Sequence, residues 1–212
     1  GGAWVNPLEP IVRDLDFTHV CAAVEPRLFI GATNVRTGKV RVFSGTEISP
    51  EVLMASACIP TVFQAVDIGG DSYWDGGFAG NPSLWPLYEP DLPDDVVIVQ
   101  VNPLRREAVP DTPLEIQNRI NEISFNASLL GELRAAAFVK RLIARGQIAK
   151  GQMKDPRIHI ISDDGLMNEL TAATKLQPSP RIVSRLFEAG QAAAEAFLHG
   201  CKGDPTTAVP VN

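Results

Sequence analysis

Apolar and polar positions alternate through part of the chain's first half, and this pattern predicts strands. Lys39–Phe43 alternates polar and apolar residues, as a strand does when only one of its faces is buried. Leu28–Asn34 precedes it and is rich in residues that favour strands, with a turn expected at Thr37-Gly38 between the two. Val20–Val24 is also apolar and β-prone, so we expect a strand there.

A second pair of strands is predicted around two adjacent glycines. Thr61–Ile68 and Asp71–Trp74 have the composition of strands, and Gly69-Gly70 between them can take the positive φ that a tight hairpin requires. A short helix is expected before this hairpin, because Ser49-Pro50 offers a capping serine and a proline suited to the first helical position. Pro60 should end this helix and force an extended exit.

The second half of the chain combines long helical patterns with short strands. Val96–Val101 is almost wholly apolar, which is typical of a strand covered on both faces, and Arg157–Ser162 predicts another short strand. Pro113–Gln147 and Arg181–Leu198 repeat apolar residues at helical spacing, so we expect two amphipathic helices. In the first helix the apolar residues that recur at roughly helical spacing are Ile116, Ile120, Ile123, Leu130, Leu133, Phe138, Val139 and Leu142. In the second helix we expect Ile182, Leu186, Ala193 and Phe197 to face inward.

Strands that alternate with helices in this way predict an α/β fold. The sequence shows no internal repeat and no clear domain boundary. We therefore expect one domain over residues 1–200, followed by a loose tail over residues 201–212, where no apolar period remains.

Composition and charge exclude several classes of partner. A net charge of −6 is opposite to the basic face that neutralises nucleic-acid phosphates, so no nucleic-acid partner is expected. No stretch approaches the roughly 18 apolar residues of a membrane span. The three cysteines are too widely spaced for a disulfide framework or a zinc site, so we expect no metal and no cofactor, and a buried free thiol at Cys58. No signal peptide is found at the start, which says little about localisation if the natural N-terminus has been removed. The localisation is left unknown, with a cytoplasmic protein favoured over a secreted one.

The most specific feature is an ordered series between Met54 and Pro82. A small-residue helix leads into Ile59-Pro60, the hairpin follows, and its second strand ends in a carboxylate and two glycines, Asp75-Gly76-Gly77, before a turn at Asn81-Pro82. This series resembles the C-terminal half of the catalytic domain of patatin-like phospholipases. The residues that match in order are Ala55, Ser56, Ala57, Ile59, Pro60, Phe63, Asp75, Gly76, Gly77 and Asn81.

The resemblance implies a serine lipid acyl hydrolase with a Ser-Asp dyad, and it assigns the dyad aspartate to Asp75. In this family the nucleophile lies in an upstream GxSxG motif, and no GxSxG occurs in these 212 residues. The chain is therefore expected to be the aspartate-bearing part of a larger domain whose N-terminal portion is missing, and to be inactive alone. The implied fold is a three-layer α/β/α domain with a mostly parallel central sheet, in which Gly76, Gly77, Asn81 and Pro60 support the motif.

The expected partners follow from the same resemblance. They are a lipid ester substrate and the missing N-terminal part of the domain, while peripheral membrane contact and self-association are left open. Apolar neighbours of Asp75 (Tyr73, Trp74 and Phe78) could desolvate the carboxyl and raise its pKa, as a general base requires. The alternative is a non-catalytic α/β binding or assembly module that keeps the fold without the reaction.

Other polar residues are interpreted as structural. Asn34 stands where the family often has an aspartate after Ala-Thr, and we expect it to cap or form a turn. The histidines belong to no recognisable triad or metal motif. A basic cluster late in the long helix fits both a solvated face near a helix C-terminus and contact with lipid headgroups. Its members are Arg134, Lys140, Arg141 and Arg145.

Overall fold

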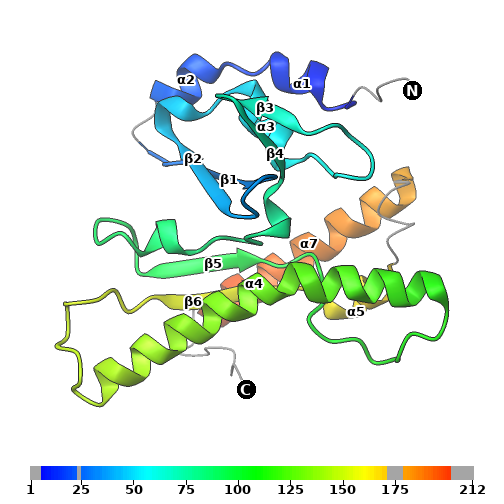
Figure 1. The fold of residues 1–212 in the computed structure, drawn as a ribbon. Coiled ribbons are helices and arrows are strands. Elements are labelled where there is room, and N and C mark those ends of the chain that lie inside the picture. The colour runs from blue at the N-terminus through cyan, green and yellow to red at the C-terminus, as the bar shows by residue number, and fades with distance from the viewer. Residues whose placement is uncertain (1–5, 23–24, 171–178, 202–212) are drawn as a thin grey trace. The chain divides into compact units, whose positions relative to one another are not determined.

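The computed structural model describes residues 6–22, 25–170 and 179–201 and divides the chain into two compact units (Figure 1). The first unit comprises Gly1–Pro86 together with Ala127–Glu132, and the second comprises Leu87–Asn126 and Leu133–Asn212. The prediction of one domain over residues 1–200 stays a prediction.

The first unit is built on a four-stranded antiparallel sheet in the order β2-β1-β4-β3. The strands are β1 (Phe29–Asn34), β2 (Val40–Ser44), β3 (Val66–Ile68) and β4 (Asp71–Asp75). β1 is central and pairs with both β2 and β4. The expected strands over residues 28–34 and 39–43 are confirmed within one residue at each end.

Specific turn residues form the β1–β2 and β3–β4 connections of this sheet. The Asn34 side chain accepts hydrogen bonds from the backbone N–H groups of Arg36 and Thr37, each at 3.0 Å, and Gly38 has a φ of +68°. Asn34 therefore forms the turn, as expected. Gly69 and Gly70 have φ values of +62° and +89°, so the predicted hairpin is confirmed.

Two predictions in this unit are wrong. The segment expected as a strand at residues 20–24 instead continues helix α2 (Phe17–Ala22), because the Asp16 carboxylate accepts from the His19 N–H and starts a helix; residues 23 and 24 lie outside the described residues. The strand expected over residues 61–68 begins only at Val66. The Ile59 carbonyl accepts from the Val62 and Phe63 N–H groups, so Pro60 lies in a turn and not at an extended exit.

Helices α1 (Glu9–Arg13) and α3 (Pro50–Ser56) complete the first unit with α2, and two short 3₁₀ turns flank the sheet. The predicted start of α3 is confirmed, since the Ser49 hydroxyl accepts from the Val52 N–H and Pro50 is the first helical residue. Val52 and Ala55 on α3 are fully buried against the sheet.

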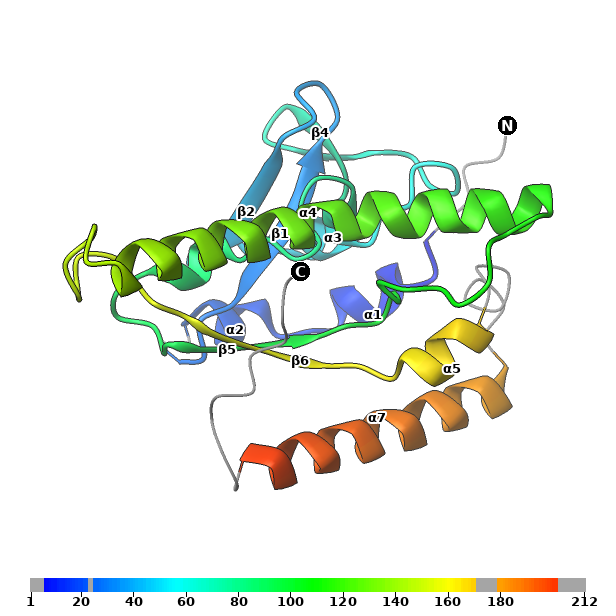
Figure 2. The ribbon, with the colours of Figure 1, turned by 90° about the horizontal axis from the view of Figure 1, so that it is seen from below.

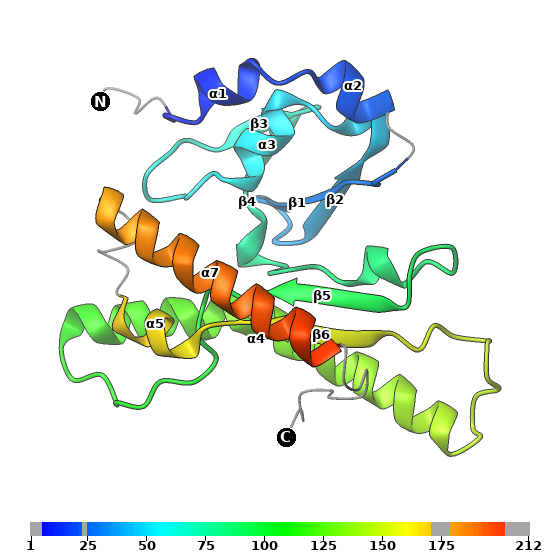
Figure 3. The same ribbon diagram turned by 180° about the vertical axis from the view of Figure 1, so that it is seen from behind.

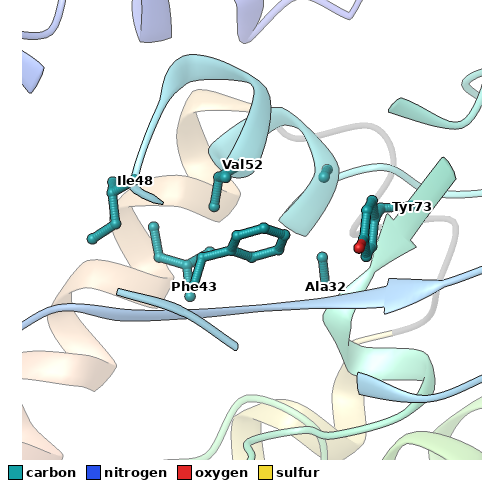
Figure 4. Packing of buried hydrophobic residues seen from close by; sticks show 7 residues of the cluster. Ala32, Phe43, Ile48, Val52 and Tyr73 are labelled. Carbon is teal, nitrogen blue, oxygen red and sulfur yellow. The ribbon is translucent and has the colours of Figure 1, made fainter. Parts of the chain in front are cut away.

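The core of the first unit lies between α3 and the sheet (Figure 4). Val52 points from the helix toward Phe43 and Ala32 on the strands, and Ile48 closes one end. The rings of Phe43 and Tyr73 meet edge to face with centroids 5.6 Å apart, a favourable aromatic geometry. This core holds β1 and β4 side by side.

The second unit contains a parallel pair of strands, β5 (Asp95–Val99) and β6 (Arg157–Ile161), with a long helix between them in sequence (Figure 2). That helix is α4 (Pro113–Ala144); α5 (Asp164–Glu169) follows β6, and α7 (Pro180–Cys201) follows later. α7 lies against β6, where the His159 and Phe197 rings meet at 5.7 Å (Figure 3).

Burial along β5 differs from the expectation. Val96 and Ile98 are buried, but Val97 and Val99 are exposed, Val99 by 70%. The prediction of a strand covered on both faces is therefore wrong for the described residues, because β5 pairs only with β6 and packs through one face.

The predicted start of α4 at Pro113 is confirmed, whereas the helix ends at Ala144, before the expected Gln147. Thr112 and Glu115 form a reciprocal capping box, and Gly146, just beyond the helix end, has a φ of +68°. Leu133 is buried. Five of the other apolar residues at helical spacing are exposed, and two polar side chains of the helix are buried. The exposed residues are Ile116, Ile120, Ile123, Leu130 and Phe138, and the buried polar ones are Glu122 and Asn126.

Glu122 and Asn126 are buried because each has polar partners in the loop that precedes the helix. The Glu122 carboxylate accepts hydrogen bonds from Nε and Nη2 of Arg106, and it forms an ion pair with Arg119 at 3.3 Å. Asn126 donates to the Pro103 carbonyl at 3.0 Å. In α7 the expected inward positions Ile182, Ala193 and Phe197 are half-buried, whereas Leu186 is exposed.

The fold class is α/β, with one antiparallel sheet and one parallel pair. A three-layer arrangement with a mostly parallel central sheet is not confirmed. Within the described part of the chain, no helix has both the length and the apolar character that a membrane crossing needs.

Candidate functional site

Asp75 is fixed at the end of β4 by three hydrogen bonds. Its N–H donates to the Cys58 carbonyl at 2.9 Å, and its carbonyl accepts from the Thr33 hydroxyl at 2.8 Å. Its side chain caps the 3₁₀ turn η2 (Gly76–Phe78) by accepting from the Gly77 N–H at 2.7 Å. β1, the end of α3 and η2 thus orient one carboxyl group.

The electrostatic setting of this carboxyl suits a proton acceptor. Burial raises the pKa of Asp75 above its ordinary value of 3.8, and the hydrogen bond from Gly77 opposes this by favouring the charged form. Burial is the larger effect. A carboxylate with a raised pKa is a stronger base near neutral pH.

The Asp75 carboxyl borders a hollow of about 330 Å³, which we call the Asp75 hollow. Its walls come from β1, β2, the end of α3 and the loop after η2. Apolar side chains, glycines and two serines line it: Phe29, Gly31, Val42, Ser56, Asp75, Gly76, Gly77, Gly80, Asn81, Pro82 and Ser83. The hollow therefore brings together half of the matching motif residues: Ser56, Asp75, Gly76, Gly77 and Asn81.

Gly76 has a packing reason to be glycine. A Cβ atom there would lie 2.4 Å from the Gly31 carbonyl oxygen, well inside contact distance with rigid backbone. Its absence lets η2 approach β1 closely. Gly77 contributes its N–H to the Asp75 carboxylate. The two glycines thus permit and hold the position of the carboxyl.

Asn81 and Pro82 form one wall of the hollow, and helix α4 anchors this wall. The Asn81 N–H donates to the Ser128 hydroxyl at 2.9 Å, and the Leu84 N–H donates to the Glu132 carboxylate at 3.4 Å. Ser128 and Glu132 were missed by the sequence reasoning because they stand more than forty positions away. Their spacing of four residues, which aligns them on one helix face, was the only signal.

Pro60 and Cys58 do not line the Asp75 hollow. Pro60 shapes the turn that follows α3. The Cys58 thiol is free and buried, as predicted; it donates to the Gln64 carbonyl at 3.1 Å. Burial and the nearby Asp75 charge raise the pKa of this thiol, which disfavours a reactive thiolate.

The structure brings no metal-ligand group and no histidine to the Asp75 hollow within the described residues. Among the residues that the structure describes, no group of three or more His, Cys, Asp or Glu side chains could hold a metal ion. His159 contacts Asp95 at 2.9 Å, and His199 contacts the Glu195 carbonyl. None of the three histidines lines the Asp75 hollow.

A second hollow, of about 420 Å³, lies in the second unit beside Arg106 and Glu122. Arg106 also donates to the carbonyls of Asn168 and Leu170, so it ties α5 to α4. Arg119 donates to the Leu104 carbonyl. The charged groups here hold the polypeptide together, and we assign this hollow no chemistry.

Comparison with known proteins supports the motif in the first unit. A search of curated proteins found no match. The family model for Patatin-like phospholipase matches residues 1–88, a range that contains Asp75 and every strand of the antiparallel sheet. Residues 1–88 are therefore similar to patatin-like phospholipases, as the ordered motif indicated.

Proposed function

We propose that this chain is the aspartate-bearing part of a patatin-like lipid acyl hydrolase, and that Asp75 is the general base of its Ser-Asp dyad. One observation carries the proposal. Asp75 is a partly buried carboxyl with a raised pKa, fixed at a strand end beside a hollow in a patatin-like segment.

In the proposed reaction Asp75 accepts the proton of a serine hydroxyl while the serine oxygen attacks the ester carbonyl. The bond to the leaving alcohol breaks, and that alcohol takes the proton from Asp75. Water then attacks the acyl-serine and gives a proton to Asp75. The bond between the acyl carbon and the serine oxygen breaks, that oxygen takes the proton back from Asp75, and the fatty acid is released. Because the 212 residues contain no GxSxG motif, the proposal assigns the nucleophile to a serine outside them.

The lining of the Asp75 hollow supports an ester substrate. Phe29 and Val42 offer apolar surface, and the Gly77 N–H lies beside the Asp75 carboxyl. A volume of about 330 Å³ lies at the small end of ligand sites, roughly 300–1,000 Å³. It would accommodate the ester group and part of an acyl chain.

We further propose that the complete domain is a three-layer α/β/α structure with a mostly parallel central sheet, extending over residues 1–200 with a tail at 201–212. The parallel pair β5–β6 supports this proposal. Parallel strands occur almost only in larger sheets with both faces covered, and β5 leaves Val97 and Val99 exposed.

The test compares ester hydrolysis by the protein with its natural N-terminal residues and by its Asp75→Asn variant. Asn keeps the shape and the acceptor for Gly77 but cannot take a proton. We expect a loss of about 100-fold or more in kcat, the usual contribution of a general base. Asp71→Asn, on the same strand, is the matched control and should change kcat less than about twofold. In the wild type, kcat should rise with pH through the raised pKa of Asp75.

Labelling with a fluorophosphonate identifies the nucleophile. An adduct on a serine N-terminal to Gly1 agrees with the proposal. An adduct on Ser56 or Ser83, which both line the hollow, would overturn the assignment of the nucleophile to an outside serine. Equal hydrolysis by wild type and Asp75→Asn would exclude the catalytic role and favour the non-catalytic module.

A further inference from the structure

The long helix α4 carries an exposed stripe along one face, and the first half of this stripe is apolar. Ile116, Ile120, Ile123 and Leu130 follow the spacing of one helix face, and all four are exposed, Ile120 and Ile123 by more than half. Branched apolar side chains aligned over four turns are uncommon on a surface that faces only water. Transfer of these side chains from water to an apolar environment would therefore be favourable.

The second half of the same face is aromatic and basic. Arg134, Phe138, Arg141 and Arg145 continue the spacing, and all four are exposed. The Arg141 guanidinium lies 5.7 Å from the Phe138 ring centroid, within cation–π range. Among the described residues, none of these three arginines takes part in an ion pair. From Ile116 to Arg145 the stripe is about 44 Å long at the rise of an α-helix.

Negative charge is excluded from this surface. The helix has two glutamates between Ile116 and Arg145; Glu122 is buried and Glu132 is half-buried, so its exposed positions over that range carry arginines and no acid. The whole chain, in contrast, has a net charge of −6. The charged side chains on this face are therefore all positive.

We propose that this stripe of α4 docks on the surface of an anionic lipid bilayer. An interfacial helix buries apolar side chains at the boundary between headgroups and acyl chains and keeps basic side chains near the phosphates. The isoleucines and Phe138 supply the apolar contact. The arginines supply the attraction to anionic headgroups, and their long stems can reach the phosphates while Phe138 inserts. The inference stands on α4 alone and does not require Asp75 chemistry.

The charge pattern favours a bilayer over a second copy of the chain. A bilayer offers apolar depth and anionic headgroups along its whole surface, so it satisfies both halves of the stripe together. Two stripes paired in parallel would bring arginines face to face, and paired antiparallel they would bury arginines against isoleucines. Neither arrangement satisfies both halves.

The test is co-sedimentation with vesicles of phosphatidylcholine alone or mixed with phosphatidylserine. The wild type should bind the mixed vesicles more tightly, and added salt should weaken that preference. The triple variant Arg134→Gln, Arg141→Gln, Arg145→Gln should lose about 100-fold in affinity for mixed vesicles, at about fivefold for each arginine. The double variant Ile120→Gln, Ile123→Gln should weaken binding to both vesicle types by about tenfold.

The matched control removes three exposed arginines elsewhere, with the same change in net charge: Arg36→Gln, Arg105→Gln, Arg181→Gln. It should bind the mixed vesicles within about threefold of the wild type. Equal losses in both triple variants, or no binding by the wild type, would overturn the proposal. So would a wild-type dimer in light scattering that dissociates in the isoleucine variant while vesicle binding is unchanged, because a second copy would then occupy the stripe.

Discussion

The core of the first unit and helix α4 of the second unit use apolar residues in opposite ways. In the first unit the large apolar side chains are inside: Phe43, Tyr73 and Val52 are almost completely buried between α3 and the sheet. In the second unit α4 buries Glu122 and Asn126, with 8% and 5% exposure, and turns its isoleucines outward. The first unit has an ordinary hydrophobic core, whereas this part of the second is organised by a buried ion pair.

This difference teaches that hydrophobic periodicity identifies a helix without deciding which face is internal. On α4 the apolar stripe is regular, yet hydrogen bonds from Arg106 and to the Pro103 carbonyl select the polar face as the buried one. A buried polar group must be paired, and here the neighbouring loop provides the partners. Substitutions that disrupt the buried ion pair of the second unit or the close packing of the first unit test this difference.

The largest effect is expected from Glu122→Gln in the second unit. This substitution keeps the size of the side chain but leaves two largely buried arginines without their carboxylate. Removing one partner of a buried ion pair costs roughly 3–5 kcal/mol. We expect a loss of about 3 kcal/mol in the free energy of unfolding, measured by urea denaturation, with faster amide exchange in α5.

Glu107→Gln is the matched control for this prediction. Its carboxylate pairs with Arg105 at 3.6 Å, but the Glu107 side chain is 80% exposed. Surface pairs contribute little, so the loss should be below about 0.5 kcal/mol. Similar small losses in both variants would show that the buried pair does not organise this unit.

In the first unit, the elements that the sequence predicted correctly have capping or turn residues next to them in the chain. Ser49 beside Pro50, the pair Gly69-Gly70 and the turn at Asn34 each contain their own conformational signal, so the elements around them were found. The strand expected at residues 20–24 was wrong because the capping carboxylate of Asp16 outweighs β propensity in a short apolar run. Residues close in sequence decided these outcomes.

The site could be predicted only in part for a related reason. Asp75 and its glycines form one contiguous motif, which a reader of the sequence can recognise. The wall at Asn81 depends on Ser128, and the close approach at Gly76 depends on Gly31. Because these contacts join residues more than forty positions apart, the local sequence pattern does not predict them.

A smaller effect is expected from Gly76→Ala in the first unit. The new Cβ would lie 2.4 Å from the Gly31 carbonyl oxygen, so η2 or β1 must shift. Overpacking of this kind costs roughly 1–3 kcal/mol. Gly131→Ala in α4 is the matched control, because nothing lies within 4 Å of its added Cβ and alanine favours a helix; it should stabilise by up to about 1 kcal/mol. Two losses of equal size would refute the close approach at Gly76.

The smallest effect has the opposite sign and concerns the stability of Asp75→Asn. Burial raises the pKa of Asp75, so the native state binds this proton more tightly than the unfolded state. Its contribution to stability is therefore largest at low pH and falls as pH rises from the ordinary value of 3.8 through the raised value. Asn does not titrate and can still accept from Gly77.

We therefore expect Asp75→Asn to be more stable than the wild type at neutral pH, by less than about 1 kcal/mol because solvent screens a partly open carboxyl. Below the ordinary pKa of aspartate the difference should vanish, since both side chains are then neutral. Urea denaturation at both pH values measures it, with Asp71→Asn as the matched control. A variant less stable than the wild type at neutral pH would mean that the carboxylate stabilises the fold, and that the first unit, too, depends on a buried charge.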